Sequence, residues 1–231
     1  MESSPEIITN IVYYSSLYFA IFFYYLLPAY LIGSIPFGYL LTKHILKTDI
    51  RTVGSGNIGA TNVLRSGNKK IAALTLFLDG LKGAAFILFL SFFVVTTMED
   101  ILDQPQGPKY YAYLSIVGLF AILGHCFPVW LKFKGGKGVA TTFGVLFAAV
   151  PWTGFIAAVT WGIVAGFSRY SSLSALSAVA IAPLVTLIYY GPMPAGITVL
   201  IAALVFWRHK DNIKRLTAGT EPKIGAKKEK D

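Results

Sequence analysis

Long apolar stretches separated by short polar segments dominate this chain. Each is about 20 residues long or slightly less, which is the length that a helix needs to cross a bilayer. We therefore expect an all-α polytopic membrane protein with a single helical bundle and no separate soluble domain. The stretches are Leu17–Thr42, Ile71–Thr97, Tyr110–Leu131, Val139–Phe167, Ser171–Tyr190 and Ala195–Trp207.

The composition supports a membrane protein. Of the 231 residues, 55% are hydrophobic and only 13% are charged, whereas a soluble domain carries about a quarter charged residues. The mean hydropathy is +0.63. A soluble enzyme or binding module of this length is therefore disfavoured.

The distribution of basic residues predicts the orientation. The formal net charge is +9, and of the 20 basic residues all but Lys82 and Lys109 fall on one face if the N-terminus lies outside. By the positive-inside rule, the N-terminus is then external and the C-terminus cytoplasmic. Because topology explains the charge, we predict no nucleic-acid partner.

The stretch Val139–Phe167 is ambiguous, because its 29 residues could form one tilted helix or two short ones. A single crossing would divide the basic residues evenly between the two faces. Two short crossings, folded near Val150-Pro151-Trp152, keep the asymmetry. We therefore expect seven transmembrane helices, with the fourth and fifth short.

The chain ends flank this bundle. Residues 1–16 contain no basic residue and so lack the positive start of a signal peptide; we interpret them as an external extension or interfacial helix. Residues 17–222 form the membrane domain, and residues 223–231 are a basic disordered tail with some attraction to anionic lipid. The single cysteine, Cys126, excludes an intrachain disulfide. We expect no cofactor and no metal site.

Two polar, glycine-rich loops carry the candidate chemistry. One covers residues 53–65 and the other residues 132–138. Glycines let consecutive N–H groups approach a ligand, while Ser, Asn and Thr add short donors and Arg and Lys add fixed charge. Both loops could instead be solvated basic turns with helix caps. Their composition favours a phosphate site, although the P-loop spacing is absent.

These loops and the C-terminal segment resemble the three signature regions of the PlsY-type acyl-phosphate:glycerol-3-phosphate acyltransferases of bacterial membranes. The similarity covers about residue 30 to 222, and the N-terminal extension is the main departure from it. The matching stretches are Gly33–Gly38, Gly54–Arg65, Gly124–Trp130, Phe133–Thr141, Arg208–Leu216 and Gly219–Glu221, with Asp79–Gly83 and Arg169–Leu173 also fitting.

The resemblance implies transfer of a fatty acyl group from acyl phosphate to the 1-hydroxyl of glycerol 3-phosphate, at the cytoplasmic face of the bacterial inner membrane. The products are lysophosphatidic acid and phosphate, which links the protein functionally to an enzyme that makes acyl phosphate. The implied catalytic residues are Ser55, Arg65, Lys137, His209 and Asn212. The implied substrate-binding residues are Gly54, Gly56, Asn57, Thr61, Asn62, Gly135, Gly136 and Ser172.

The activated donor makes a covalent enzyme intermediate unnecessary, so positioning and oxyanion stabilisation could carry the reaction. The proton acceptor stays open between His209 and a substrate phosphate oxygen, and we favour the phosphate. A transporter or channel for an organic phosphate is the alternative function. Transporters, however, usually place their site near the midplane between related halves, and no inverted repeat is visible here.

Other residue pairs have plainer interpretations. His44 and Asp49 have the HxxxxD spacing of a different acyltransferase family, but that family's other motifs are missing. Cys126 is expected to be a buried free thiol, since its neighbour His125 faces another side of the helix. Asp79 and Lys82 are expected to form a structural ion pair inside the membrane.

Overall fold

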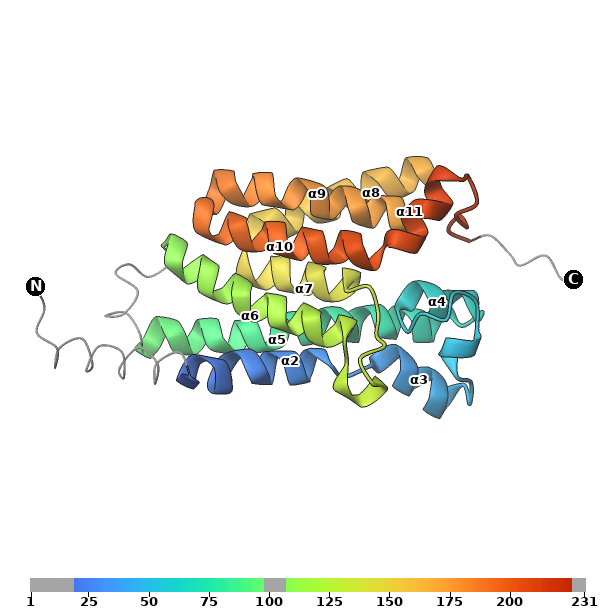
Figure 1. Cartoon of the computed structure of the whole chain (residues 1–231), viewed down its shortest axis with the longest axis horizontal. Coiled ribbons are helices and arrows are strands. Elements are labelled where there is room, and N and C mark those ends of the chain that lie inside the picture. The colour runs from blue at the N-terminus through green and yellow to red at the C-terminus, as the bar shows by residue number, and fades with distance from the viewer. Residues whose placement is uncertain (1–18, 98–106, 226–231) are drawn as a thin grey trace, which may run out of the picture.

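The computed structural model describes residues 19–97 and 107–225, and every regular element in these ranges is helical. Figure 1 shows the long helices lying side by side along the longest axis. In chain order the elements are η1 (Phe22–Leu26), α2 (Leu27–Gly33), α3 (Phe37–Ile45), η2 (Ile50–Thr52), α4 (Ala60–Arg65), α5 (Lys69–Thr97), α6 (Pro108–Cys126), η3 (Val129–Leu131), α7 (Val139–Ala149), α8 (Pro151–Ser168), α9 (Ser171–Tyr190), α10 (Pro192–Arg208) and α11 (Lys210–Thr217).

The helix lengths confirm a polytopic membrane protein. Five segments are long and apolar enough to cross a membrane, namely Phe19–Ile45, Lys69–Phe92, Pro108–Leu131, Pro151–Ser168 and Ser171–Tyr190. α10 and α11 together pass the same test but are bent by 63° at their junction. α7 is a shorter apolar helix. Seven crossings and the orientation of the termini therefore remain predictions, and residues 1–16 and 226–231 lie outside the described residues.

The predicted break between two helices near Val150 is present. α7 ends at Ala149, Val150 leaves helical geometry with φ −140° and ψ 73°, and Pro151 begins α8. Proline suits a first helical position because its missing N–H would have no partner there. With 11 residues, α7 extends about 16 Å, much less than a hydrocarbon core of about 30 Å, so this fourth helix is short as predicted. α8 has 18 residues and is the shortest of the five segments long enough to span, so a short fifth crossing stays a prediction.

A buried ion pair joins α5 to the break between α2 and α3. Lys82 Nζ lies 2.8 Å from Asp79 Oδ1, and both side chains are almost completely buried. The same ammonium donates a hydrogen bond of 2.7 Å to the carbonyl of Ile35, next to Pro36, where the first span is interrupted. The predicted structural ion pair is confirmed, and it also satisfies a carbonyl released by that break.

Close packing between helices depends on glycine. α5 packs against α7, and α2 packs against α6. A Cβ atom on Gly144 of α7 would overlap the carbonyl of Gly80 on α5, and one on Gly124 of α6 would overlap the carbonyl of Tyr30. Small residues are typical of membrane helix interfaces because they let backbones approach closely.

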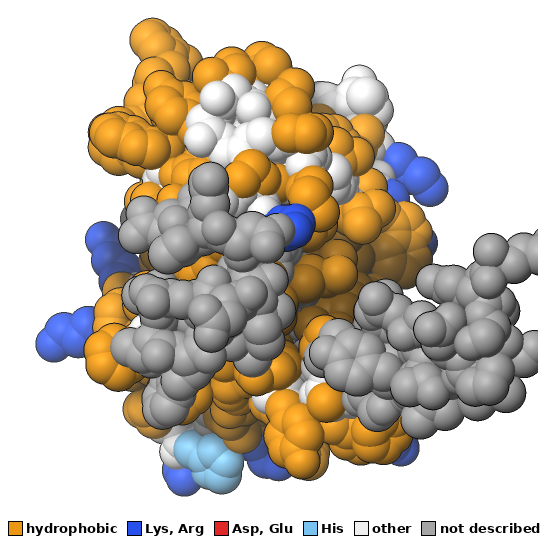
Figure 2. Space-filling view, turned by 90° about the vertical axis from the view of Figure 1, so that its left-hand side faces the viewer, with side chains coloured by type: hydrophobic (Ala, Val, Ile, Leu, Met, Phe, Trp, Pro, Cys, Tyr) orange, Lys and Arg blue, Asp and Glu red, His pale blue; other side chains and the backbone are white. Residues whose placement is uncertain are grey.

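The two ends of the bundle differ in character. α3, α4 and α11 lie at one end, to the right in Figure 1. The opposite end presents a largely hydrophobic surface of described side chains (Figure 2). The polar loops therefore gather at a single end of the molecule, as a one-sided site requires.

Candidate active site

Asn62 organises the first loop. Its Nδ2 donates to the carbonyls of Ile50, Val53 and Asn57 at 3.1, 2.9 and 2.8 Å. Its Oδ1 accepts from the N–H of Ser55 at 3.0 Å. The side chain is buried, with 2% exposed. Both ends of the amide are thus occupied by the loop itself, so Asn62 fixes the shape of the loop.

Two glycines of this loop have left-handed backbone conformations, Gly54 with φ 57° and Gly56 with φ 69°. L-residues with side chains seldom adopt that region. A Cβ on Gly54 would also press against the side chain of Asn62. Asn57 closes an Asx turn by accepting from the N–H of Gly59 at 3.1 Å. These local interactions leave Ser55 exposed at the tip of the loop.

The second loop is held from two sides. On the inner side, the N–H of Gly136 donates to the carbonyl of His125 at 3.0 Å. On the outer side, Arg208 donates from Nε to the carbonyl of Gly136 at 3.0 Å and from Nη2 to that of Gly135 at 2.9 Å. The guanidinium also lies 5.2 Å from the centre of the Phe127 ring. The N–H of Gly136 is therefore hydrogen-bonded within the protein and is not free to donate to a ligand. A substrate-binding role for Gly136 stays a prediction.

A polar network connects this loop to the C-terminal segment, residues 208–221. Lys137 Nζ donates to Asn212 Oδ1, and Asn212 Nδ2 donates to Glu221 Oε1 at 2.6 Å. The same Oε1 accepts from the hydroxyl of Ser172 at 2.8 Å, while Glu221 Oε2 lies 2.7 Å from Arg215 Nε. Ser172, Asn212 and Glu221 are buried. Ser172 thus contacts the network.

A cavity of about 260 Å³ lies where the first loop, the second loop and the C-terminal segment meet. It is lined by Ser55, Gly56, Asn57, Gly135, Lys137, Trp207, Arg208, Lys210, Asp211, Asn212 and Arg215. Residues far apart in the sequence thus surround one small, predominantly basic space. Its size and charge suit a phosphate group together with a short polar backbone.

Lys137 is the most strongly perturbed cation of this cavity. Burial lowers its pKa to about 8; the carboxylate of Glu221 acts in the opposite direction, and the cations Arg215 and Arg65 lower it further. The pKa of Glu221 is lower than usual even though burial raises it, because hydrogen bonds from Asn212, Ser172 and Arg215 favour the carboxylate. The cavity therefore holds an ammonium that an anionic ligand would stabilise.

Seven predicted site residues do not line the cavity. Four of them, described above, are Gly54, Asn62, Gly136 and Ser172, and the other three are Arg65, Thr61 and His209. Arg65 is exposed at the end of α4, with its side chain near Gly54. Thr61 is exposed, with its hydroxyl 3.5 Å from that of Ser171. His209 is buried with 2% exposed, and its Nδ1 lies 2.8 Å from the carbonyl of Val205. Because a carbonyl only accepts, Nδ1 carries the proton in this contact.

Sequence reasoning missed several cavity residues. Arg208 and Arg215 line the cavity and lie within a matching stretch, yet neither was assigned a role. Glu221, which belongs to the adjoining polar network, was also given none. The positive charge of the two arginines was the available signal, but it was attributed to topology. Trp207 gave no signal, because an aromatic residue at the end of an apolar span is ordinary.

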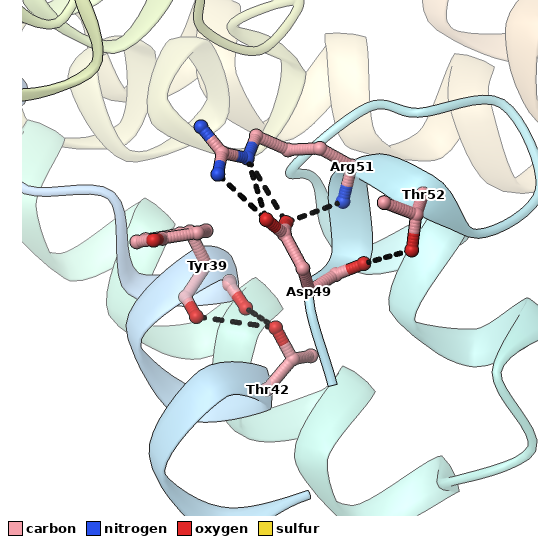
Figure 3. Close-up of polar contacts among 6 residues, drawn as sticks. Tyr39, Thr42, Asp49, Arg51 and Thr52 are labelled. Atoms are coloured by element: carbon pink, nitrogen blue, oxygen red, sulfur yellow. Dashed lines mark hydrogen bonds and ion pairs between the residues drawn. The ribbon is translucent and has the colours of Figure 1, made fainter. Parts of the chain in front are cut away.

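The HxxxxD pair forms no site. Asp49 is engaged by Arg51, with Nη2 to Oδ2 at 2.6 Å, and the guanidinium lies over the ring of Tyr39 at 4.7 Å (Figure 3). This hydrogen-bonded ion pair lowers the pKa of Asp49 to about 2. His44 is exposed. Asp49 thus orders the start of the first loop.

Comparison with known proteins identifies the family. A family model described as glycerol-3-phosphate acyltransferase matches residues 22–219. The chain belongs to the glycerol-3-phosphate acyltransferase family. A family member from Agrobacterium fabrum is 48% identical over 201 residues, covering 87% of this chain and 91% of the relative. Another, from Rhodopseudomonas palustris, is 50% identical over 204 residues, covering 88% and 95%.

Solved structures agree with this family assignment. The crystal structure of PlsY (YgiH), an integral membrane glycerol 3-phosphate acyltransferase in its glycerol 3-phosphate form, is 38% identical in sequence, with a TM-score of 0.75. The match covers 87% of this chain and 94% of PlsY. A lysophosphatidic acid form of PlsY matches with a TM-score of 0.72, covering 91% of this chain and 96% of PlsY. The PlsY fold therefore covers most of this chain.

Proposed function

We propose that this protein transfers a fatty acyl group from acyl phosphate to the 1-hydroxyl of glycerol 3-phosphate. The observation that carries the proposal is the basic cavity in which Ser55, Lys137 and Asn212 meet from three separate segments. The family membership and the PlsY structures support the acceptor and the product. The donor is inferred from the signature motifs and from the absence of a carrier-docking domain in the described residues.

In the proposed reaction, the 1-hydroxyl oxygen attacks the carbonyl carbon of the acyl phosphate. The new ester C–O bond forms, the bond between the carbonyl carbon and the phosphate oxygen breaks, and phosphate leaves with that electron pair. Lys137 and the arginines of the cavity hold the two phosphates close together against their mutual repulsion. Ser55 and the adjacent backbone contribute neutral donors.

The hydroxyl proton passes to a substrate phosphate oxygen in this proposal. His209 is the alternative acceptor, but its ring is buried behind the cavity wall and its Nδ1 is committed to Val205. A phosphate oxygen, in contrast, is necessarily next to the reacting hydroxyl. Substrate-assisted proton transfer therefore needs no rearrangement of the protein.

Asn62, Gly136 and Ser172 take revised roles. Each has its polar groups engaged within the protein, so we assign them to shaping the cavity. Ser55, Gly56, Asn57, Gly135, Lys137 and Asn212 remain the proposed substrate contacts. Gly54 provides the turn that exposes Ser55, while Arg65 approaches the second phosphate from the rim.

The cavity is proposed to face the cytoplasm from the bacterial inner membrane. Its segments carry most of the basic residues, which the positive-inside rule places there. At the cytoplasmic surface of the membrane, glycerol 3-phosphate from the water and an acyl phosphate held in the lipid can both reach the cavity. An enzyme that forms acyl phosphate must supply the donor.

The deciding experiment incubates purified protein with labelled glycerol 3-phosphate and palmitoyl phosphate. We expect labelled lysophosphatidic acid and one phosphate released per acyl transfer. A parallel reaction contains palmitoyl-CoA in place of palmitoyl phosphate. Rapid turnover with palmitoyl-CoA alone would overturn the donor, and uptake of label into vesicles without an acylated product would favour a transporter.

A further inference from the structure

A buried polar cluster lies outside the cavity and has no part in the proposed chemistry. His125 Nδ1 lies 3.6 Å from Asp79 Oδ1, and Asp79 is in turn paired with Lys82. The side chains of all three residues are at most 4% exposed. Charged groups at this depth are costly and usually serve a function. A well-packed apolar trio would often be as stable as such a cluster.

His125 forms the floor of the second loop. Its carbonyl accepts the N–H of Gly136 at 3.0 Å. A Cβ on Gly136 would overlap the imidazole ring, and one on Gly135 would overlap the carbonyl of His125. The loop backbone therefore lies directly on this residue, with Arg208 holding its other side.

The opposite edge of the imidazole faces the ion pair of α5, although Nδ1 is not within hydrogen-bond distance of Asp79. Asp79 and Lys82 belong to α5, and the Lys82 ammonium reaches the carbonyl of Ile35 at the break in the first span. The cluster thus links α5, α6 and the end of α2 beneath one loop. A shift of the ring would move Gly136 and, one residue later, Lys137.

We propose that His125, packed between Asp79 and the backbone of Gly136, is a positioning residue that sets the location of Lys137. This inference rests on the proposed function for the role of Lys137. His125 does not itself line the cavity, so it acts through the backbone of residues 135–137. Displacements of about 1 Å at a catalytic group cost on the order of 100-fold in rate.

A double-mutant cycle tests this inference. His125→Ala, and the shorter but polar His125→Asn, are measured alone and combined with Lys137→Ala. Each single variant should lower kcat/KM about 10- to 100-fold and weaken binding of glycerol 3-phosphate, measured by calorimetry without any donor. In the Lys137→Ala background, the same change should cost less than about threefold, since residues that act as a unit are not additive.

The matched control is Ser115→Ala, a buried change on the same helix, whose effect should be the same in both backgrounds. Membrane insertion is checked for every variant, and the cycle uses His125→Asn if the alanine variant does not insert. Full activity of an inserted variant overturns the inference, as does an equal fold-loss with and without Lys137. A wrong donor assignment would instead abolish turnover of the unaltered protein while leaving the calorimetric comparison intact.

Discussion

Lys137 is a largely buried, charged residue at the end of a tightly packed glycine loop. Its ammonium contacts Asn212 at the wall of the cavity, and the glycines before it have no room for side chains. A charged residue in such a place has lost much of its hydration, so an anionic substrate gains more from it than from a surface lysine.

Replacing Lys137 by alanine should lower kcat/KM about 30- to 1000-fold, which corresponds to roughly 2–4 kcal/mol for a desolvated charged contact. Lys70→Ala is the control, because that exposed lysine is the second residue of α5 and does not line the cavity. Its effect should be less than about tenfold. Equal losses at both positions would show that general positive charge, and not this site, supports activity.

The pH dependence of kcat/KM should show the titration of the Lys137 ammonium. The pKa of Lys137 is lowered to about 8, so the charged form is complete well below pH 8 and is lost as the pH rises through that value. We expect kcat/KM, which reports the free enzyme, to fall on the alkaline side with a midpoint near 8. Lys137→Arg stays charged and should lose this decline, at a lower maximum. An unchanged decline in the arginine variant would assign it to another group.

At the scale of elements, close helix contacts decide how the loops converge. α5 and α7 approach through Gly80 and Gly144, and α7 begins just after Lys137. The distance between these two helices therefore affects the packing of the core and also the position of the second loop, which leads into α7.

Gly144→Ala should destabilise the protein by about 1–3 kcal/mol, the usual range for overpacking, because its Cβ would overlap a backbone carbonyl. Gly162→Ala on α8 is the matched control, since nothing lies within 4 Å of that position. Alanine there should be neutral or stabilising by up to about 1 kcal/mol. Thermal unfolding in detergent provides the comparison, and equal Tm values for the two variants would contradict this packing argument.

For the whole molecule, the polar loops and the apolar end make it one-sided (Figures 1 and 2). The single cysteine is fully buried, which makes the chain suitable for accessibility mapping. Cys126→Ala should retain most activity, because the proposed reaction uses no thiol.

In that background, Gly107→Cys and Ala218→Cys place thiols near opposite ends of the bundle. An impermeant maleimide should label intact cells at position 107 and should label position 218 only after permeabilisation. This pattern follows from an external N-terminus and a cytoplasmic cavity. The reverse labelling pattern would invert the proposed orientation, and labelling at both positions in intact cells would contradict a one-sided topology.

The sequence by itself determined the class of fold, because apolar runs of spanning length have few alternatives in a membrane protein. It also located the break at Val150, where proline and the distribution of basic residues gave the same answer. Ser55, Lys137 and Asn212 could be selected from their motifs. Only the tertiary structure separated cavity residues from supporting ones, since Asn62, Gly136 and Ser172 look equally polar or glycine-rich in the sequence. The hydrogen-bond partner of Ser172 is 49 residues away in the chain, whereas those of Asn62 lie in its own loop and just before it. In both cases the pairing follows from how the chain folds, which the sequence pattern does not record.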